Sequence, residues 1–159
     1  MYITYDEYTA IYDPIEEKLF NRLAYDACRE LDRQTTGADG VKKLKSAFPT
    51  DADSAEAVKR CAAQVINILA QIHEAEKSAS MGRGFIATEN GMQGKIVYSV
   101  AAGNESITYS TSSAKTAVDT AVANPVAKDS MIYWIIRNHL SGVADANGVN
   151  LLFMGRYPV

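Results

Sequence analysis

The sequence has few of the residues, and none of the motifs, that reaction and metal sites usually need. It contains two histidines and two cysteines, and the cysteines, Cys28 and Cys61, form no CxxC pair. It also lacks the HExxH, GxSxG, GxGxxG and P-loop patterns. These absences argue against an enzyme, and we expect no catalytic residue, no cofactor and no bound metal ion.

The cysteines and histidines that are present have structural interpretations. Cys28 and Cys61 lie among small or apolar neighbours on predicted helices, which is typical of buried, reduced thiols. A disulfide or redox role is the alternative. His73 and His139 lie late in two predicted helices, where a histidine interacts favourably with the helix dipole.

Long apolar runs, a signal-peptide pattern and a strong net charge are also missing. No apolar run reaches the roughly 18 residues that cross a bilayer, so no membrane span is expected. The opening MYITYDEYTA lacks a basic segment followed by an apolar one, so we expect the protein to work where it is made. A net charge of −3 does not suggest a nucleic-acid surface, and the small cluster Lys42–Lys45 is typical of a solvated face.

Apolar residues make up 47% of the chain, enough for one hydrophobic core, and their spacing is mainly helical. Thr4-x-x-Glu7 is a capping-box pattern that predicts a short helix over about 5–12. A second helix is expected to end near Thr36, with Gly37 as its cap. Its start is predicted by a cap, a first-turn proline and a capping-box glutamate: Asp13, Pro14 and Glu16.

A third, longer helix is expected after a turn or two of helix that precedes Pro49. Asp53-x-x-Glu56 predicts its start, and the pattern continues to about Lys77. Its apolar stripe comprises Val58, Cys61, Ala62, Val65, Leu69 and Ile72.

The last major helix is expected from about Ser113 to the residues before Gly142. Pro125 should kink it or start a new helix, because proline cannot continue the helical hydrogen bonds. The core stripe and the residues expected to widen it are Ile132, Ile135, Ile136, Leu140, Met131, Tyr133 and Trp134.

Between the third and last major helices, residues 84–101 predict one flexible β-hairpin. Ile96, Tyr98 and Val100 alternate with their neighbours in its second arm. An isolated hairpin is marginally stable in water, so this one should pack on the helices, pair with another chain or be mobile.

The chain ends with an apolar segment over about 149–159, after a polar turn at 145–148. Val149–Met154 is expected to be extended, and 156–159 to be mobile. The segment could fold back over the helices or pair with another subunit. Three of its residues are expected to be at least partly buried: Leu151, Leu152 and Phe153.

Together these features predict one domain over residues 1–159. Its fold class is mainly α, a small helical bundle with one flexible β-hairpin insertion between the third and last major helices. Four tyrosines crowd the first twelve residues, and their rings either dock the first helix on the core or form an aromatic contact surface. These tyrosines are Tyr2, Tyr5, Tyr8 and Tyr12.

Four stretches resemble the head–tail connector (head–tail adaptor) proteins of tailed phages and prophages. The first is the Tyr-rich start and the helix that ends in (Ile/Leu)-Asp-Arg-x-Thr, here Leu31–Thr35. The second is the helix EAVKRCAAQVINILAQ, and the third is IATENGMQGKIVYSV, which is similar to the family's hairpin. The fourth is the Leu-Ser-Gly turn followed by Leu-Leu near the C-terminus. Met154 stands where the family usually has arginine, and Arg156–Val159 extends past its usual end.

The resemblance implies a structural virion protein at the head–tail junction, made in the bacterial cytoplasm. Such proteins form a ring, dodecameric in the family, below the portal protein, and they offer a docking surface to tail or stopper proteins. DNA passes through the lumen without sequence-specific binding, and neither a cofactor nor a membrane is implied. The alternative is a helical, protein-binding regulator of a bacterial host. Candidate interface residues are Tyr2, Tyr5, Tyr8, Ile96, Tyr98, Leu151, Leu152 and Phe153.

Overall fold

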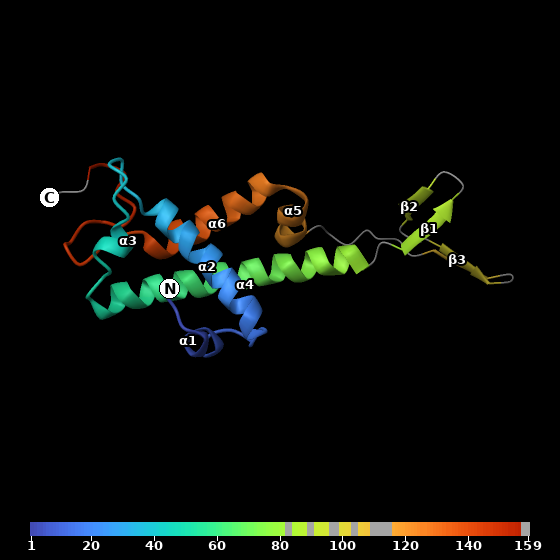
Figure 1. The fold of residues 1–159 in the computed structure, drawn as a ribbon, viewed down its shortest axis with the longest axis horizontal. Helices are drawn as coiled ribbons and strands as arrows, with labels where there is room; N and C mark the ends of the chain where they lie inside the picture. The colour runs from blue at the N-terminus through green and yellow to red at the C-terminus, as the bar shows by residue number, and fades with distance from the viewer. Residues whose placement is uncertain (82–83, 89–90, 96–98, 103–104, 109–115, 157–159) are drawn as a thin grey trace.

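Six helices and four short strands make up the computed structural model, which describes residues 1–81, 84–88, 91–95, 99–102, 105–108 and 116–156 (Figure 1). This mainly helical architecture confirms the predicted fold class. The helices are α1 (Tyr5–Thr9), α2 (Glu17–Gln34), α3 (Lys43–Ser46), α4 (Ala52–Met81), α5 (Ala117–Ala123) and α6 (Pro125–Leu140).

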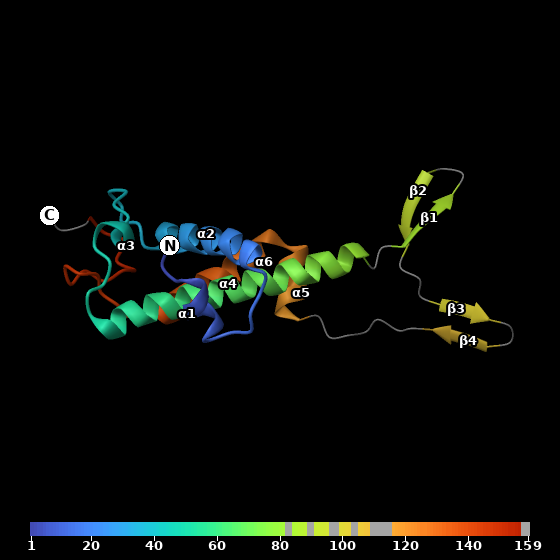
Figure 2. The ribbon, with the colours of Figure 1, turned by 60° about the horizontal axis from the view of Figure 1, so that its bottom comes forward.

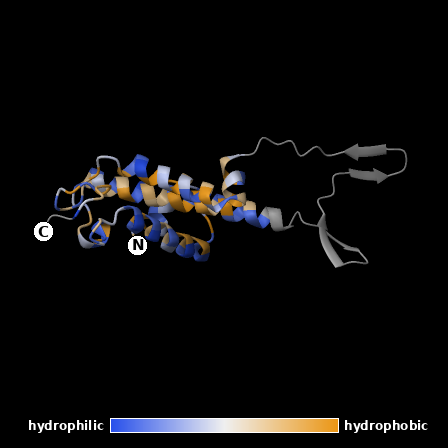
Figure 3. Cartoon of the chain, turned by 90° about the horizontal axis from the view of Figure 1, so that it is seen from above, coloured by the Kyte–Doolittle hydropathy of each residue, from blue (hydrophilic) through white to orange (hydrophobic). Residues whose placement is uncertain are grey.

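The long helix α4 is the centre of the bundle, and α2 and α6 pack along it (Figures 1 and 2). Apolar and hydrophilic residues interleave along these helices, as amphipathic helices require (Figure 3). Burying one large aliphatic or aromatic side chain stabilises a fold by roughly 1.5–3 kcal/mol, so the shared core holds the three helices together. Its fully or nearly fully buried members include Phe20, Leu23, Leu31, Val58, Val65, Ile66, Ile132, Ile136 and Leu140.

Helix α1 docks through its tyrosine rings, in agreement with the first of the two interpretations. The capping box of Thr4 and Glu7 is present, although the helix ends at Thr9 and is shorter than expected. The Tyr8 ring is completely buried beside Phe20, with ring centroids 5.4 Å apart. Tyr8 is therefore a core residue, and its prediction as an interface residue is wrong.

Two predicted helix starts and one predicted helix end are wrong in detail. Glu16 is the N-cap of α2 and makes no side-chain capping bond, so the expected cap at Asp13 does not form. Helix α4 starts at Ala52, two residues before the start that a cap at Asp53 predicts, and the Asp51 carboxylate accepts the Ser54 amide at 2.9 Å. Helix α2 ends at Gln34, and the Thr35 hydroxyl donates to the Leu31 carbonyl at 2.8 Å.

Gly37 is needed for a close approach and not as a helix cap. A Cβ atom at this position would lie 3.0 Å from the Gly155 carbonyl oxygen and 2.8 Å from the Asp39 carboxylate. The neighbouring Ala38 amide donates to the same Gly155 carbonyl at 3.3 Å. The absence of a side chain thus lets the C-terminal segment lie against the loop after α2.

The region between α4 and α5 forms two strand pairs where one hairpin was expected. Strand β1 (Gly84–Thr88) pairs with β2 (Gly91–Lys95), and β3 (Ser99–Ala102) pairs with β4 (Glu105–Thr108), both antiparallel. The single hairpin over 84–101 is therefore wrong, since the second expected arm is divided between β2 and β3. Ile96 and Tyr98 lie outside the described residues.

Pro125 starts a new helix and does not kink a continuous one, which confirms the second of the two predicted alternatives. Asn124 is extended, with φ −139° and ψ 109°, and its side chain caps the Val126 amide at 2.9 Å. Helix α6 then ends at Leu140, and Gly142 turns the chain away with a φ of 81°. A proline-led start and a glycine stop thus fix both ends of α6.

The C-terminal segment folds back on the bundle beside α3 (Figures 1 and 2). Leu151 is completely buried and Leu152 is partly buried, which confirms both predictions, but Phe153 is 49% exposed. The segment is extended only at Asn150, which forms an isolated antiparallel bridge with Ala144, and a turn at Leu151 and Leu152 then ends the extended backbone. Of the two alternatives for this segment, Leu151 therefore follows the first, in which the segment folds back over the helices.

Replacing Leu151 by alanine should lower the free energy of unfolding by about 2–5 kcal/mol, because the change leaves a cavity in the core. Met154→Ala is the matched control, since Met154 is 63% exposed in the same segment. Urea unfolding followed by circular dichroism measures both. Equal stability of the two variants would show that the segment is not packed on the core.

Candidate interaction surfaces

Lys43 anchors the C-terminal segment. Its Nζ donates to the Leu151 carbonyl at 3.1 Å and also to the Phe153 carbonyl, and the side chain is fully buried. Burial lowers the pKa of Lys43, while the nearby carboxylates of Asp145 and Asp39 act in the opposite direction. The prediction of a solvated basic cluster is therefore wrong at Lys43.

Asp145 organises the turn that leads into this segment. The aspartate is 5% exposed, and one of its carboxylate oxygens accepts the amides of Asn147 and Val149, each at 2.9 Å. The Ala146 amide donates to the Ala47 carbonyl at 3.2 Å, which joins the turn to the end of α3. Lys43 thus holds the C-terminal segment at Leu151 and Phe153, and the Asp145 turn joins the start of the segment to α3.

The Leu31–Thr35 motif is structural. Asp32 is 5% exposed, accepts a hydrogen bond from the Tyr2 hydroxyl and pairs with Lys45 at 3.1 Å. Burial and this carboxylate raise the pKa of Tyr2, which keeps the hydroxyl protonated. One carboxylate on α2 therefore fixes the N-terminal residues and α3.

Most of the predicted interface residues serve the fold. Tyr2 and Tyr5 are partly buried, and the Tyr5 hydroxyl donates to the Ile15 carbonyl at 2.7 Å. Leu151 is core, and Leu152 packs against it. Of the predicted set within the described residues, only Phe153 belongs to the exposed class.

An exposed apolar surface lies on α6 and the neighbouring C-terminal residues. It consists of Val126 (71% exposed), Tyr133 (39%), Trp134 (58%) and Met154 (63%). Two adjoining grooves share Tyr133 and Gln34, and they link Val126 at one end to Met154 at the other. We call these four residues the α6 surface. The expectation that Tyr133 and Trp134 widen the core stripe is wrong.

The α6 surface has a fixed internal geometry. The rings of Tyr133 and Trp134 meet edge to face, with centroids 5.7 Å apart and planes at 74°. The Arg137 guanidinium donates to the Tyr133 hydroxyl at 3.0 Å. Two large aromatic side chains are therefore positioned at the surface, where such rings commonly anchor protein partners.

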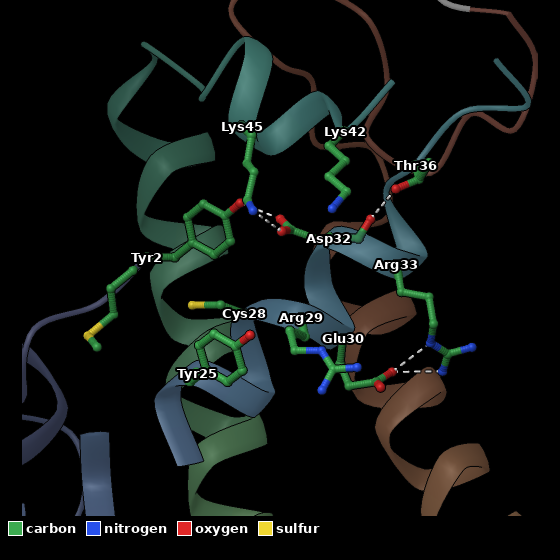
Figure 4. Close-up of a pocket in the computed structure, with 11 residues that line it drawn as sticks. Tyr2, Tyr25, Cys28, Arg29, Glu30, Asp32, Arg33, Thr36, Lys42 and Lys45 are labelled. Carbon is green, nitrogen blue, oxygen red and sulfur yellow. Dashed lines mark hydrogen bonds and ion pairs between the residues drawn. The ribbon is translucent and has the colours of Figure 1, made fainter. Parts of the chain in front are cut away.

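A second exposed feature is a basic hollow at the C-terminal end of α2 (Figure 4). Its volume of about 820 Å³ is enough to receive several side chains of a partner. Figure 4 shows its cations around two carboxylates, where Arg33 pairs with Glu30 at 2.7 Å. The charged residues are Arg29, Arg33, Lys42, Lys45, Glu30 and Asp32.

The cysteines are free thiols with raised pKa values. Burial raises the pKa of Cys61 to about 12 and also raises that of Cys28, which is partly buried. His139 meets the Gln64 amide oxygen at 2.5 Å, and burial and Arg60 lower its pKa. His73 does not end its helix, since α4 continues to Met81. The dipole interpretation therefore fails for His73.

A metal-binding cluster and a membrane-spanning helix are both absent from the described residues. They contain no group of three or more histidine, cysteine or acidic residues placed to hold a metal ion. None of the described helices is long and apolar enough to cross a membrane.

Comparison with known proteins gives no match: neither a protein-family model, nor a curated protein, nor a solved structure is significantly similar to this chain. The sequence does carry one signal for the α6 surface. Residues 131–136 are apolar around most of the helix, and a helix with apolar residues on two faces has one face left to cover.

The variant Lys43→Met should lower the free energy of unfolding by about 1–3 kcal/mol, because the buried Leu151 carbonyl loses its donor. Lys42→Met is the matched control at the preceding, exposed position, and we expect its free energy of unfolding to stay within about 0.5 kcal/mol of the wild type. Thermal unfolding at neutral pH compares the two. A Lys43→Met protein as stable as the wild type would contradict the anchoring role.

Proposed function

We propose that this chain is a structural subunit of the head–tail junction of a tailed phage or prophage. In this role it forms a ring under the portal protein and offers a face to tail or stopper proteins. The ordered resemblance of the four stretches supports the assignment, and the helical bundle agrees with the fold that the resemblance implies.

The observation that carries a binding role is the α6 surface. Tyr133 and Trp134 stand exposed on a rigid helix, and tryptophan and tyrosine dominate the energetics of protein interfaces. Covering such rings removes apolar area from water, so a partner gains binding energy there without any rearrangement of the bundle. We assign this surface to the contact with the portal protein.

The test is binding of the full chain to portal rings from the same genome, followed by native mass spectrometry and electron microscopy. The wild type should add a ring of subunits below the portal. Trp134→Ala should weaken binding about thirtyfold or more, because a central aromatic anchor contributes about 2 kcal/mol or more. Arg22→Ala, at an exposed position on α2 that lines neither of the α6 grooves, should bind like the wild type.

Two results would count against the proposal. A chain that never binds portal rings, at any concentration at which it remains soluble, would contradict the connector role. Stable capture of a bacterial regulatory protein in place of the portal would favour the alternative, a helical regulator of the host. Melting temperatures of both variants show whether a loss of binding reflects a loss of fold.

A further inference from the structure

The basic hollow has unpaired positive charge. Lys45 pairs with Asp32 and Arg33 pairs with Glu30, but Arg29 and Lys42 form no ion pair with any residue that the structure describes. Both are exposed, and Arg29 lies 6.0 Å above the ring centroid of Tyr25, which is itself 64% exposed. The hollow thus combines two free cations with an apolar ring.

An exposed acidic turn lies at the other end of the same helix. Asp13, Glu16 and Glu17 are exposed, and none of them pairs with a cation among the described residues. Ile11, which precedes them, is 41% exposed. We call residues 11–17 the acidic turn. It combines free carboxylates with an apolar side chain, and these features complement the free cations and the exposed ring of the hollow.

The two surfaces cannot neutralise each other within one molecule. Glu16 and Arg29 lie thirteen residues apart along the chain of α2, which corresponds to roughly 20 Å of helix. At physiological salt, interactions between exposed charges are largely screened beyond about 8 Å. The free charges at the two ends of α2 are therefore available to a second molecule.

We propose that the acidic turn of one copy of this chain binds in the basic hollow of the next. The carboxylates of Asp13 and Glu16 meet Arg29 and Lys42, and Ile11 covers the ring of Tyr25. Because the two surfaces differ, the contact is head-to-tail, and head-to-tail contacts are the kind that build rings. The inference rests on the proposed function and deepens it, since it names the contact between ring subunits.

Two variants of the full chain each remove one side of this contact. The hollow variant is Arg29→Ala/Lys42→Ala, and the turn variant is Asp13→Asn/Glu16→Gln. Glu17 is retained because a carboxylate in the first turn stabilises the helix. The control, Arg22→Ala/Lys128→Ala, removes two positive charges, as the hollow variant does, but from positions outside both surfaces.

Sedimentation equilibrium at low ionic strength measures self-association up to millimolar concentration. The wild type and the control should self-associate, and each contact variant should do so about tenfold or more weakly, because it loses charges that face the opposite sign. An equal mixture of the two contact variants should form dimers and nothing larger. In this mixture the intact turn of the hollow variant can bind the intact hollow of the turn variant, and the resulting dimer has no intact surface left with which to grow.

Several results would overturn the contact. A wild type that stays monomeric throughout, a hollow variant that associates like the wild type, or a mixture that stays monomeric each contradicts it. Loss of binding to a short DNA duplex in the hollow variant, with unchanged self-association, would assign the hollow to a phosphate backbone. Portal binding is measured separately. A chain that binds portal rings but lacks this contact keeps the connector role and loses only the subunit contact. A chain that self-associates but never binds portal rings keeps the contact and loses the connector role.

Discussion

The buried amine of Lys43 is the interaction on which the arrangement of the chain's end depends. It reaches the carbonyls of Leu151 and Phe153 from a helix more than a hundred residues earlier in the sequence. A buried amine costs desolvation energy, so it persists only where acceptors surround it. Here those acceptors are two backbone carbonyls, and the bond to the Leu151 carbonyl is buried. The lysine and the segment therefore satisfy each other's hydrogen-bonding groups.

This constraint decides which surfaces remain exposed. Because the C-terminal segment lies on α3, Leu151 joins the core and Met154 comes to rest at the end of the α6 grooves. The Asp32 carboxylate acts in the same way at the start of the chain, where it fixes Tyr2 and α3. The features that stay exposed in the described part of the chain include the α6 surface and the two charged ends of α2.

The sequence predicts the helices well and the surfaces poorly, for physical reasons. Capping at Thr4 and the proline start at Pro125 are local interactions, so they can be read from neighbouring residues. The role of Lys43 cannot, because KKLK has the pattern of a solvated face and its acceptors are distant in sequence. Likewise, Trp134 sits in an almost uninterrupted apolar run, where spacing alone does not say which side faces the core. For the N-terminal tyrosines the sequence leaves docking and an aromatic contact surface open, and docking is confirmed for Tyr8, which is completely buried, while Tyr2 and Tyr5 are partly buried.

Amide hydrogen exchange of the wild-type chain tests the central claim most directly. The Leu151 amide donates to the Val143 carbonyl at 2.9 Å, and the Ala146 amide donates to the Ala47 carbonyl. If Lys43 holds the segment on the bundle, both amides should be protected nearly as strongly as those in the middle of α4, and should exchange only with global unfolding. Exchange of the Leu151 amide at the rate of an unstructured peptide, with α4 still protected, would contradict the account.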